Sequence, residues 1–167
     1  GKRPVPHGTQ VGVGTVLILK LVEALRKTNI DFDAARAAAK GYDQAAWEEK
    51  IRMAYGPAAQ GVIDMEAKAK KNETNARLER IDSMEKNWAE ITALLEALPA
   101  SETVMDLLKS LDASYLPDQI EVDEEMLRNT FLYCKEVRAR YTILQMIWDL
   151  GLLDTLSEQV MKELQNK

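Results

Sequence analysis

The sequence predicts an all-α fold with about seven or eight helices. Apolar residues recur at helical spacing in several segments, and no segment shows the alternation that is typical of a half-buried strand. The clearest apolar stripe has spacings of three and four residues and consists of Ile81, Met84, Trp88, Ile91, Leu95 and Leu98. With 167 residues, 46% of them hydrophobic and 29% charged, the chain is long enough for one globular domain with a sizeable core.

The first half of the chain is expected to hold four helices. An apolar helix covers residues 16–25, and a short alanine-rich helix starts near Asp31 and ends at Gly41. A third helix spans residues 47–55. A fourth starts at Pro57, because proline suits the first turn of a helix.

The second half is expected to hold two long helices, a shorter one between them, and a last helix through Leu156, Val160 and Leu164. One runs from about residue 75 to 97 and stops before Pro99. Ser101 is expected to cap the next helix, since serine side chains satisfy free backbone N–H groups there. Residues 123–150 are expected to form one long helix that ends at Gly151.

Composition excludes several classes of function. The chain has 22 Lys and Arg against 27 Asp and Glu, a net charge of −5, and no basic cluster for nucleic acid. The apolar stretch 11–19 is much shorter than the ~20 residues of a membrane span, so no membrane partner is expected. A single cysteine, Cys134, excludes an internal disulfide and suits the cytoplasm. We expect it to be a small buried hydrophobe rather than a thiol nucleophile, and the acidic run 123–125 to be a helix cap rather than a metal site.

The segment before residue 16 differs from the rest. Gly8, Gly12 and Gly14 fall within seven residues, which suggests close approach of another group to the backbone. The dinucleotide pattern G-x-G-x-x-G fails because Leu17 occupies the last glycine position. Close packing of a neighbouring helix remains the simpler explanation. His7 is the one histidine of the chain, and by itself it is as consistent with an ordinary exposed residue as with a ligand.

These residues carry a family resemblance. The run His7-Gly8-x-Gln10-Val11-Gly12-x-Gly14-Thr15 resembles the last metal-ligand segment of the metal-dependent polyol dehydrogenases, the iron-containing alcohol dehydrogenase superfamily. Three further stretches are similar to the bacterial sn-glycerol-1-phosphate dehydrogenase branch: 47–50 with 55–59, 135–144, and 150–153. The resemblance extends over essentially the whole chain.

The resemblance implies a domain organisation. Residues 1–167 would form one helical, bundle-like C-terminal domain of the dehydroquinate synthase and iron-alcohol dehydrogenase type. Within it, residues 1–15 would be the metal-ligand and glycine-rich segment and residues 16–167 the helical body. The family's NAD(P)-binding domain, its aspartate ligand and its other histidine would lie outside this chain.

The resemblance also implies a site. His7 would bind a divalent Zn, Ni or Fe ion, while Gly8 and Gly12 would lie beside the substrate and the NAD(P) cofactor. The substrate would be dihydroxyacetone phosphate, which is reduced to sn-glycerol 1-phosphate, a small phosphorylated polyol. Arg138 or Arg140, expected on different faces of a helix, would bind its phosphate. Salt bridges to Glu136 or to acidic helices are at least as good an explanation of either arginine.

The catalytic set is incomplete in this chain, so we expect it to be inactive alone and to bind metal weakly. We also expect a homo-oligomer, a dimer or larger, because helix faces, including part of residues 11–25, would be exposed without their partner domain. Two alternatives remain open: a glycerol or other polyol dehydrogenase domain, and a free-standing helical interaction module without the chemistry of the family.

Overall fold

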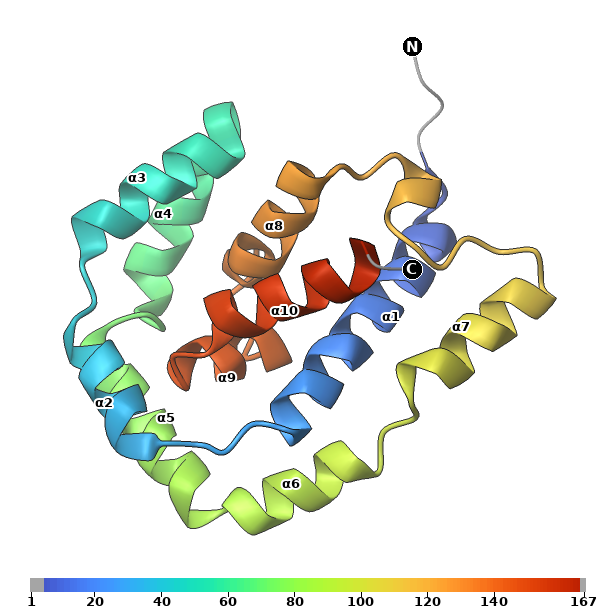
Figure 1. The fold of residues 1–167 in the computed structure, drawn as a ribbon. Coiled ribbons are helices and arrows are strands. Elements are labelled where there is room, and N and C mark those ends of the chain that lie inside the picture. The colour runs from blue at the N-terminus through green and yellow to red at the C-terminus, as the bar shows by residue number, and fades with distance from the viewer. Residues whose placement is uncertain (1–4, 166–167) are drawn as a thin grey trace. The chain divides into compact units, whose positions relative to one another are not determined.

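The chain is all-helical in a computed structural model that describes residues 5–165, and no strand occurs within this range (Figure 1). The α-helices are α1 (His7–Arg26), α2 (Phe32–Lys40), α3 (Gln44–Tyr55), α4 (Ala59–Ala69), α5 (Thr74–Lys86), α6 (Trp88–Glu96), α7 (Ser101–Ser110), α8 (Glu124–Tyr133), α9 (Ile143–Asp149) and α10 (Leu153–Gln165). Three short 3-10 helices are η1 (Gly56–Ala58), η2 (Asp118–Ile120) and η3 (Cys134–Glu136). The predicted all-α class is confirmed, and two of the expected helices are each divided in two.

The described residues form two compact units. The first consists of residues 5–29, 89–128 and 156–165, and the second of residues 30–88 and 129–155. Residues 1–4 of the expected metal-ligand segment 1–15 and residues 166–167 of the expected helical body 16–167 lie outside the described residues.

In the first unit, α1 packs against α7. The carboxylate of Glu23 on α1 accepts the backbone N–H of Ser101 at 2.5 Å and its hydroxyl at 3.0 Å. Ser101 is therefore not the cap that the sequence suggested: Ala100 occupies that position, and a side chain from another helix satisfies the first turn of α7. At the far end of α1, Arg26 donates to the carbonyls of Leu95 and Leu98.

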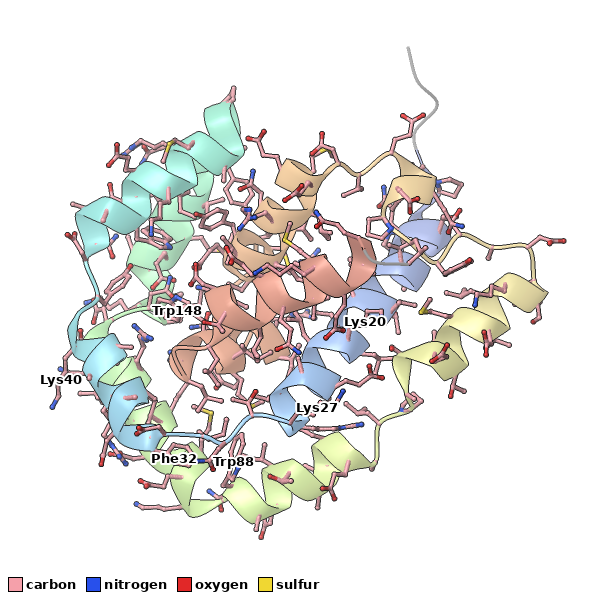
Figure 2. The ribbon with its side chains drawn as sticks, viewed as in Figure 1. Lys20, Lys27, Phe32, Lys40, Trp88 and Trp148 are labelled. Atoms are coloured by element: carbon pink, nitrogen blue, oxygen red, sulfur yellow. The ribbon has the colours of Figure 1, made fainter. Side chains whose placement is uncertain are left out.

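In the second unit, α2 packs against α5 and α3 packs against α4 (Figure 1). A hydrophobic cluster lies between α3 and α4 and consists of Trp47, Ile51, Ala59, Val62 and Ile63, with Tyr42, Tyr55 and Tyr133 packed around it. Phe32 and Trp88 meet edge to face with ring centroids 5.6 Å apart (Figure 2). Such aromatic pairs stabilise a fold beyond the area that they bury.

Aspartates cap three of the helices. The Oδ1 atoms of Asp31, Asp43 and Asp123 accept backbone N–H groups three residues ahead at 2.9, 3.1 and 2.8 Å. The expected start of α2 at Asp31 is confirmed, and so is the interpretation of the acidic run 123–125 as a cap.

The expected helix 75–97 is interrupted at Asn87, so this prediction is wrong in part. Asn87 leaves the helical region, with φ −110° and ψ 16°, and its Nδ2 donates to the carbonyl of Ser83 at 2.8 Å. Asparagine side chains compete in this way with the backbone hydrogen bonds of a helix. The apolar periodicity continues across the break because α6 begins at the next residue, Trp88.

The expected helix 123–150 is also wrong in part. It consists of α8, η3, a bent stretch at residues 137–140, and α9. Thr142 is extended and caps α9 by accepting the N–H of Gln145 at 3.3 Å. The end is as predicted: Gly151 has φ +73°, and its N–H donates to the carbonyl of Trp148 at 2.9 Å.

Candidate functional site

The N-terminal motif is helical, which the sequence did not predict. Helix α1 begins at His7 rather than near residue 16, with Pro6 as its N-cap at φ −55° and ψ 141°. The N–H of Gln10 donates to the carbonyl of Pro6 at 3.2 Å and closes the first turn. His7 and Gly8 are both exposed on this turn.

The three glycines of α1 have different surroundings. A Cβ on Gly12 would lie 3.4 Å from the side chain of Leu108 on α7, which is ordinary van der Waals contact. At Gly12 the neighbouring helix thus supplies the close approach. A Cβ on Gly8 or Gly14 would meet no atom within 4 Å, so these two glycines leave open space beside the exposed face of α1.

The described residues alone do not fit a metal centre. They contain no group of three His, Cys, Asp or Glu side chains that could hold a metal ion. His7 is the only histidine of the chain, and a catalytic metal commonly takes three protein ligands. A metal at His7 would need ligands from outside the described residues.

Arg138 and Arg140 do not lie on a helix, contrary to expectation. Both are exposed in the bent stretch 137–140. Glu136, the expected salt-bridge partner, is buried and pairs with Lys71 and Lys135 instead. No ion pair involving either arginine occurs among the described residues, so both guanidinium groups are available to an external anion.

One other expectation is wrong, and a further one holds only in part. Cys134 is exposed at the start of η3 rather than buried, because the chain leaves the helix at this point. The face of α1 in residues 11–25 is largely buried, with Val11 at 52% as its one strongly exposed apolar side chain. Exposed apolar side chains in the first unit lie mainly elsewhere, at Leu94, Leu107 and Leu111.

The most heavily charged interior lies in the second unit and was not predicted from the sequence. Glu136 is 2% exposed. Its carboxylate accepts hydrogen bonds from Trp47 Nε1 at 3.1 Å, from Lys71 Nζ at 2.7 Å and from Lys135 Nζ. Asn72 Nδ2 donates to both of its oxygens at 3.1 Å. Burial alone would raise the pKa of Glu136, but the adjacent Lys135 and Lys71 outweigh burial and lower it.

A second buried carboxylate, Asp149, lies in the same unit with no exposed surface. Arg80 binds it through two hydrogen bonds, Nε to Oδ2 at 2.6 Å and Nη2 to Oδ1 at 3.0 Å. The Nε atom of Arg77 lies 3.4 Å from Oδ1, and Gln145 Nε2 donates to Oδ1 at 3.3 Å. Burial lowers the pKa of Arg77. We call the residues around Glu136 and Asp149 the buried charge cluster; it consists of Lys71, Asn72, Arg77, Arg80, Lys135, Glu136, Gln145 and Asp149.

A cavity of about 340 Å³ opens beside this cluster. Four aromatic residues line it together with charged and aliphatic ones: Tyr42, Trp47, Tyr133 and Trp148. Trp148 is labelled in Figure 2. Its ring contacts two cations: Arg77 Cζ lies 3.6 Å and Lys135 Nζ 3.9 Å from the ring centroid. Such contacts partly replace the water that a buried cation loses.

One sequence signal could have indicated the cluster. In the apolar run 143–153, Gln145 and Asp149 are four residues apart and therefore share a face of the helix. A charged side chain on an otherwise apolar face requires a buried partner. The partners Arg77 and Arg80 come from α5, about 70 positions earlier, and nothing local in the sequence identifies them.

Comparison of the chain with models of known families, with curated proteins and with solved structures gives no match. By length and composition α1 could cross a membrane, with a mean hydropathy of 1.4. Half of that segment is buried within the structure, and core helices of water-soluble proteins meet the same criterion.

Proposed function

We propose that this chain is the metal- and substrate-binding helical domain of an NAD(P)-dependent sn-glycerol-1-phosphate dehydrogenase. The complete enzyme would transfer hydride from NAD(P)H to the carbonyl carbon of dihydroxyacetone phosphate, and this chain alone would be inactive. The observation that carries the proposal is the first turn of α1. His7 is exposed there beside the open face of Gly8, where an imidazole can join ligands supplied from outside the chain.

A phosphorylated substrate is favoured over glycerol or another unphosphorylated polyol. Arg138 and Arg140 are exposed cations in the part of the chain that resembles the glycerol-1-phosphate branch. Guanidinium groups bind phosphate through paired hydrogen bonds. We therefore assign the phosphate to one of these two side chains.

A free-standing helical interaction module is the second candidate. The observation that favours it is the lack of a three-ligand metal group among the described residues. Its exposed Leu94, Leu107 and Leu111 would support self-association, and so would the homo-oligomer that we propose for the dehydrogenase. In either case we propose a cytoplasmic protein.

Metal binding tests the assignment of His7. The complete gene product containing this chain is titrated with Ni²⁺ and Zn²⁺, as wild type, as His7→Ala and as Lys27→Ala, a control at the exposed end of α1. We expect one ion per chain in the wild type and the control, and loss of that ion in His7→Ala. Equal metal content in all three proteins would refute the assignment, and the interaction module would then be the better account.

A further inference from the structure

Two buried cations that line the cavity in the second unit, Lys135 and Arg77, have more N–H groups than their hydrogen-bond partners take up. Lys135 is 3% exposed, and of its three N–H groups one donates to Glu136. Arg77 is also 3% exposed. Its Nη2 donates to the carbonyl of Trp148 at 3.1 Å, its Nη1 donates to the carbonyl of Ala38 at 3.5 Å, and its Nε faces Asp149 Oδ1 at 3.4 Å. These contacts account for three of its five N–H groups. Buried donors without acceptors are costly, so these groups favour an incoming acceptor.

The carboxylate beside Lys135, that of Glu136, is already occupied. The carboxylate of Glu136 receives hydrogen bonds from four side chains, and a carboxylate offers about four acceptor positions. Glu136 therefore has no acceptor position left for the remaining N–H groups of Lys135. A ligand oxygen in the cavity would supply what the protein lacks.

Charge and shape restrict the ligand further. Three cations line the cavity, Lys50, Arg77 and Lys135, and three carboxylates balance them, Asp43, Glu136 and Asp154. A dianion would meet repulsion from these carboxylates, whereas a single negative charge would meet much less. The four aromatic residues of the lining suit a flat apolar body, and about 340 Å³ lies at the lower end of the range for small-molecule pockets.

We propose that this cavity binds a monoanionic carboxylate carried on a flat, apolar body, with the carboxylate at Lys135 and Arg77 and the body against Trp148 and Tyr42. The inference depends on residues of the second unit alone, and it does not rest on the function proposed for His7. If the metal titration refutes the assignment of His7, this proposal is unaffected. If the ligand titration refutes this proposal, the assignment of His7 is unaffected.

Three bicyclic probes of the same shape test the proposal by calorimetric titration of the chain. They are 2-naphthoate, the neutral 2-naphthamide and the dianionic 2-naphthyl phosphate. We expect 2-naphthoate to bind at least about tenfold more tightly than the amide, because hydrogen bonds between charged groups are stronger than those of neutral ones. We also expect it to bind more tightly than the phosphate. Binding of the amide as tightly as the carboxylate, tighter binding of the phosphate, or no binding of 2-naphthoate at millimolar concentration would overturn the proposal.

Variants locate the probe. Lys135→Met should weaken 2-naphthoate binding about tenfold, because it removes the buried ammonium. The substitution leaves Glu136 with hydrogen bonds from Trp47, Lys71 and Asn72, so we expect the unit to fold. Lys40→Met, an exposed lysine on α2, is the matched control and should bind as the wild type does. Unchanged affinity in a folded Lys135→Met would refute the site.

A second measurement on the wild type keeps the test decisive if Lys135→Met does not fold. Burial lowers the pKa of Lys135 to about 8. The charged groups that act on it are Glu136 beside it, Lys71 after α4 and Asp149 on α9. The other charged residues that line the cavity are Asp43, Lys50, Arg77 and Asp154. Affinity for 2-naphthoate should fall about tenfold between pH 7 and 9.5 as the ammonium loses its proton. Affinity that is constant over this range would contradict the proposal.

Discussion

The buried charge cluster makes a strong prediction about stability through Asp149. Replacing this residue with asparagine, Asp149→Asn, keeps the size of the side chain and removes its charge. The side chain has no exposed surface, and it neutralises Arg77 and Arg80, whose side chains are 4% and 24% exposed. In the variant, two guanidinium groups lose their buried counter-charge, and one of them, that of Arg77, is almost fully buried.

The size of the effect follows from this burial. Removing one partner of a buried ion pair costs about 3–5 kcal/mol, because the other charge stays buried without compensation. Asp149 accepts two hydrogen bonds from Arg80 and one from Gln145, and an asparagine oxygen can replace only part of these. We expect Asp149→Asn to lower the free energy of unfolding by about 3 kcal/mol or more.

Urea unfolding followed by far-ultraviolet circular dichroism measures this loss. The matched control is Asp82→Asn, in the same unit, where the carboxylate is 54% exposed and pairs with Arg36 at 2.9 Å. That ion pair is open to solvent, and Arg36 also contacts Asp33 and Glu85, so the control should unfold like the wild type. Equal, small losses in both variants would refute the claim that Asp149 holds the second unit together.

Three further predictions concern other parts of the chain. Burial lowers the pKa of Lys135 from 10.5 to about 8. At pH values between these two, the unfolded chain therefore binds more protons than the folded chain. As the pH rises from 8 to 10, urea unfolding should show the wild type gaining stability relative to Lys135→Met. A constant difference would contradict this. Glu23→Ala should cost about 1–2 kcal/mol in thermal unfolding, because Ser101 loses the acceptor for its backbone N–H; no loss would mean that Glu23 does not cap α7. Gly14→Ala should raise the free energy of unfolding by about 0.5–1 kcal/mol, since helical Gly14 has open space for a Cβ, and a decrease would show that the space is filled.

The helical class could be predicted because it depends on local periodicity, which the stripe from Ile81 to Leu95 shows clearly. The aspartate caps could also be predicted from the sequence, because Asp31 and Asp123 accept backbone N–H groups only three residues away. Ser101 shows the limit of such arguments. A serine at a helix start suggests a cap, but the first turn of α7 is satisfied by Glu23, 78 positions earlier in the chain.

The parts that were missed depend on distant contacts. The expected helix is interrupted between residues 134 and 142, where Lys135 and Glu136 are buried. There the carboxylate of Glu136 accepts hydrogen bonds from Lys71, Asn72 and Lys135. Their partners are about 64 positions away, so periodicity within the segment could not indicate the break. The motif at His7 was visible from its residues alone, but its helical conformation was not, because three glycines in seven residues argue against a helix.

The central claim is the function assigned to His7, and reduction of dihydroxyacetone phosphate tests it most directly. Oxidation of NADH or NADPH is measured with the complete gene product containing this chain, using dihydroxyacetone phosphate and, separately, unphosphorylated dihydroxyacetone. The account predicts turnover of the phosphorylated substrate, formation of sn-glycerol 1-phosphate, and loss of turnover in His7→Ala. Preference for the unphosphorylated substrate would indicate a polyol dehydrogenase, and equal turnover in wild type and His7→Ala would contradict the account.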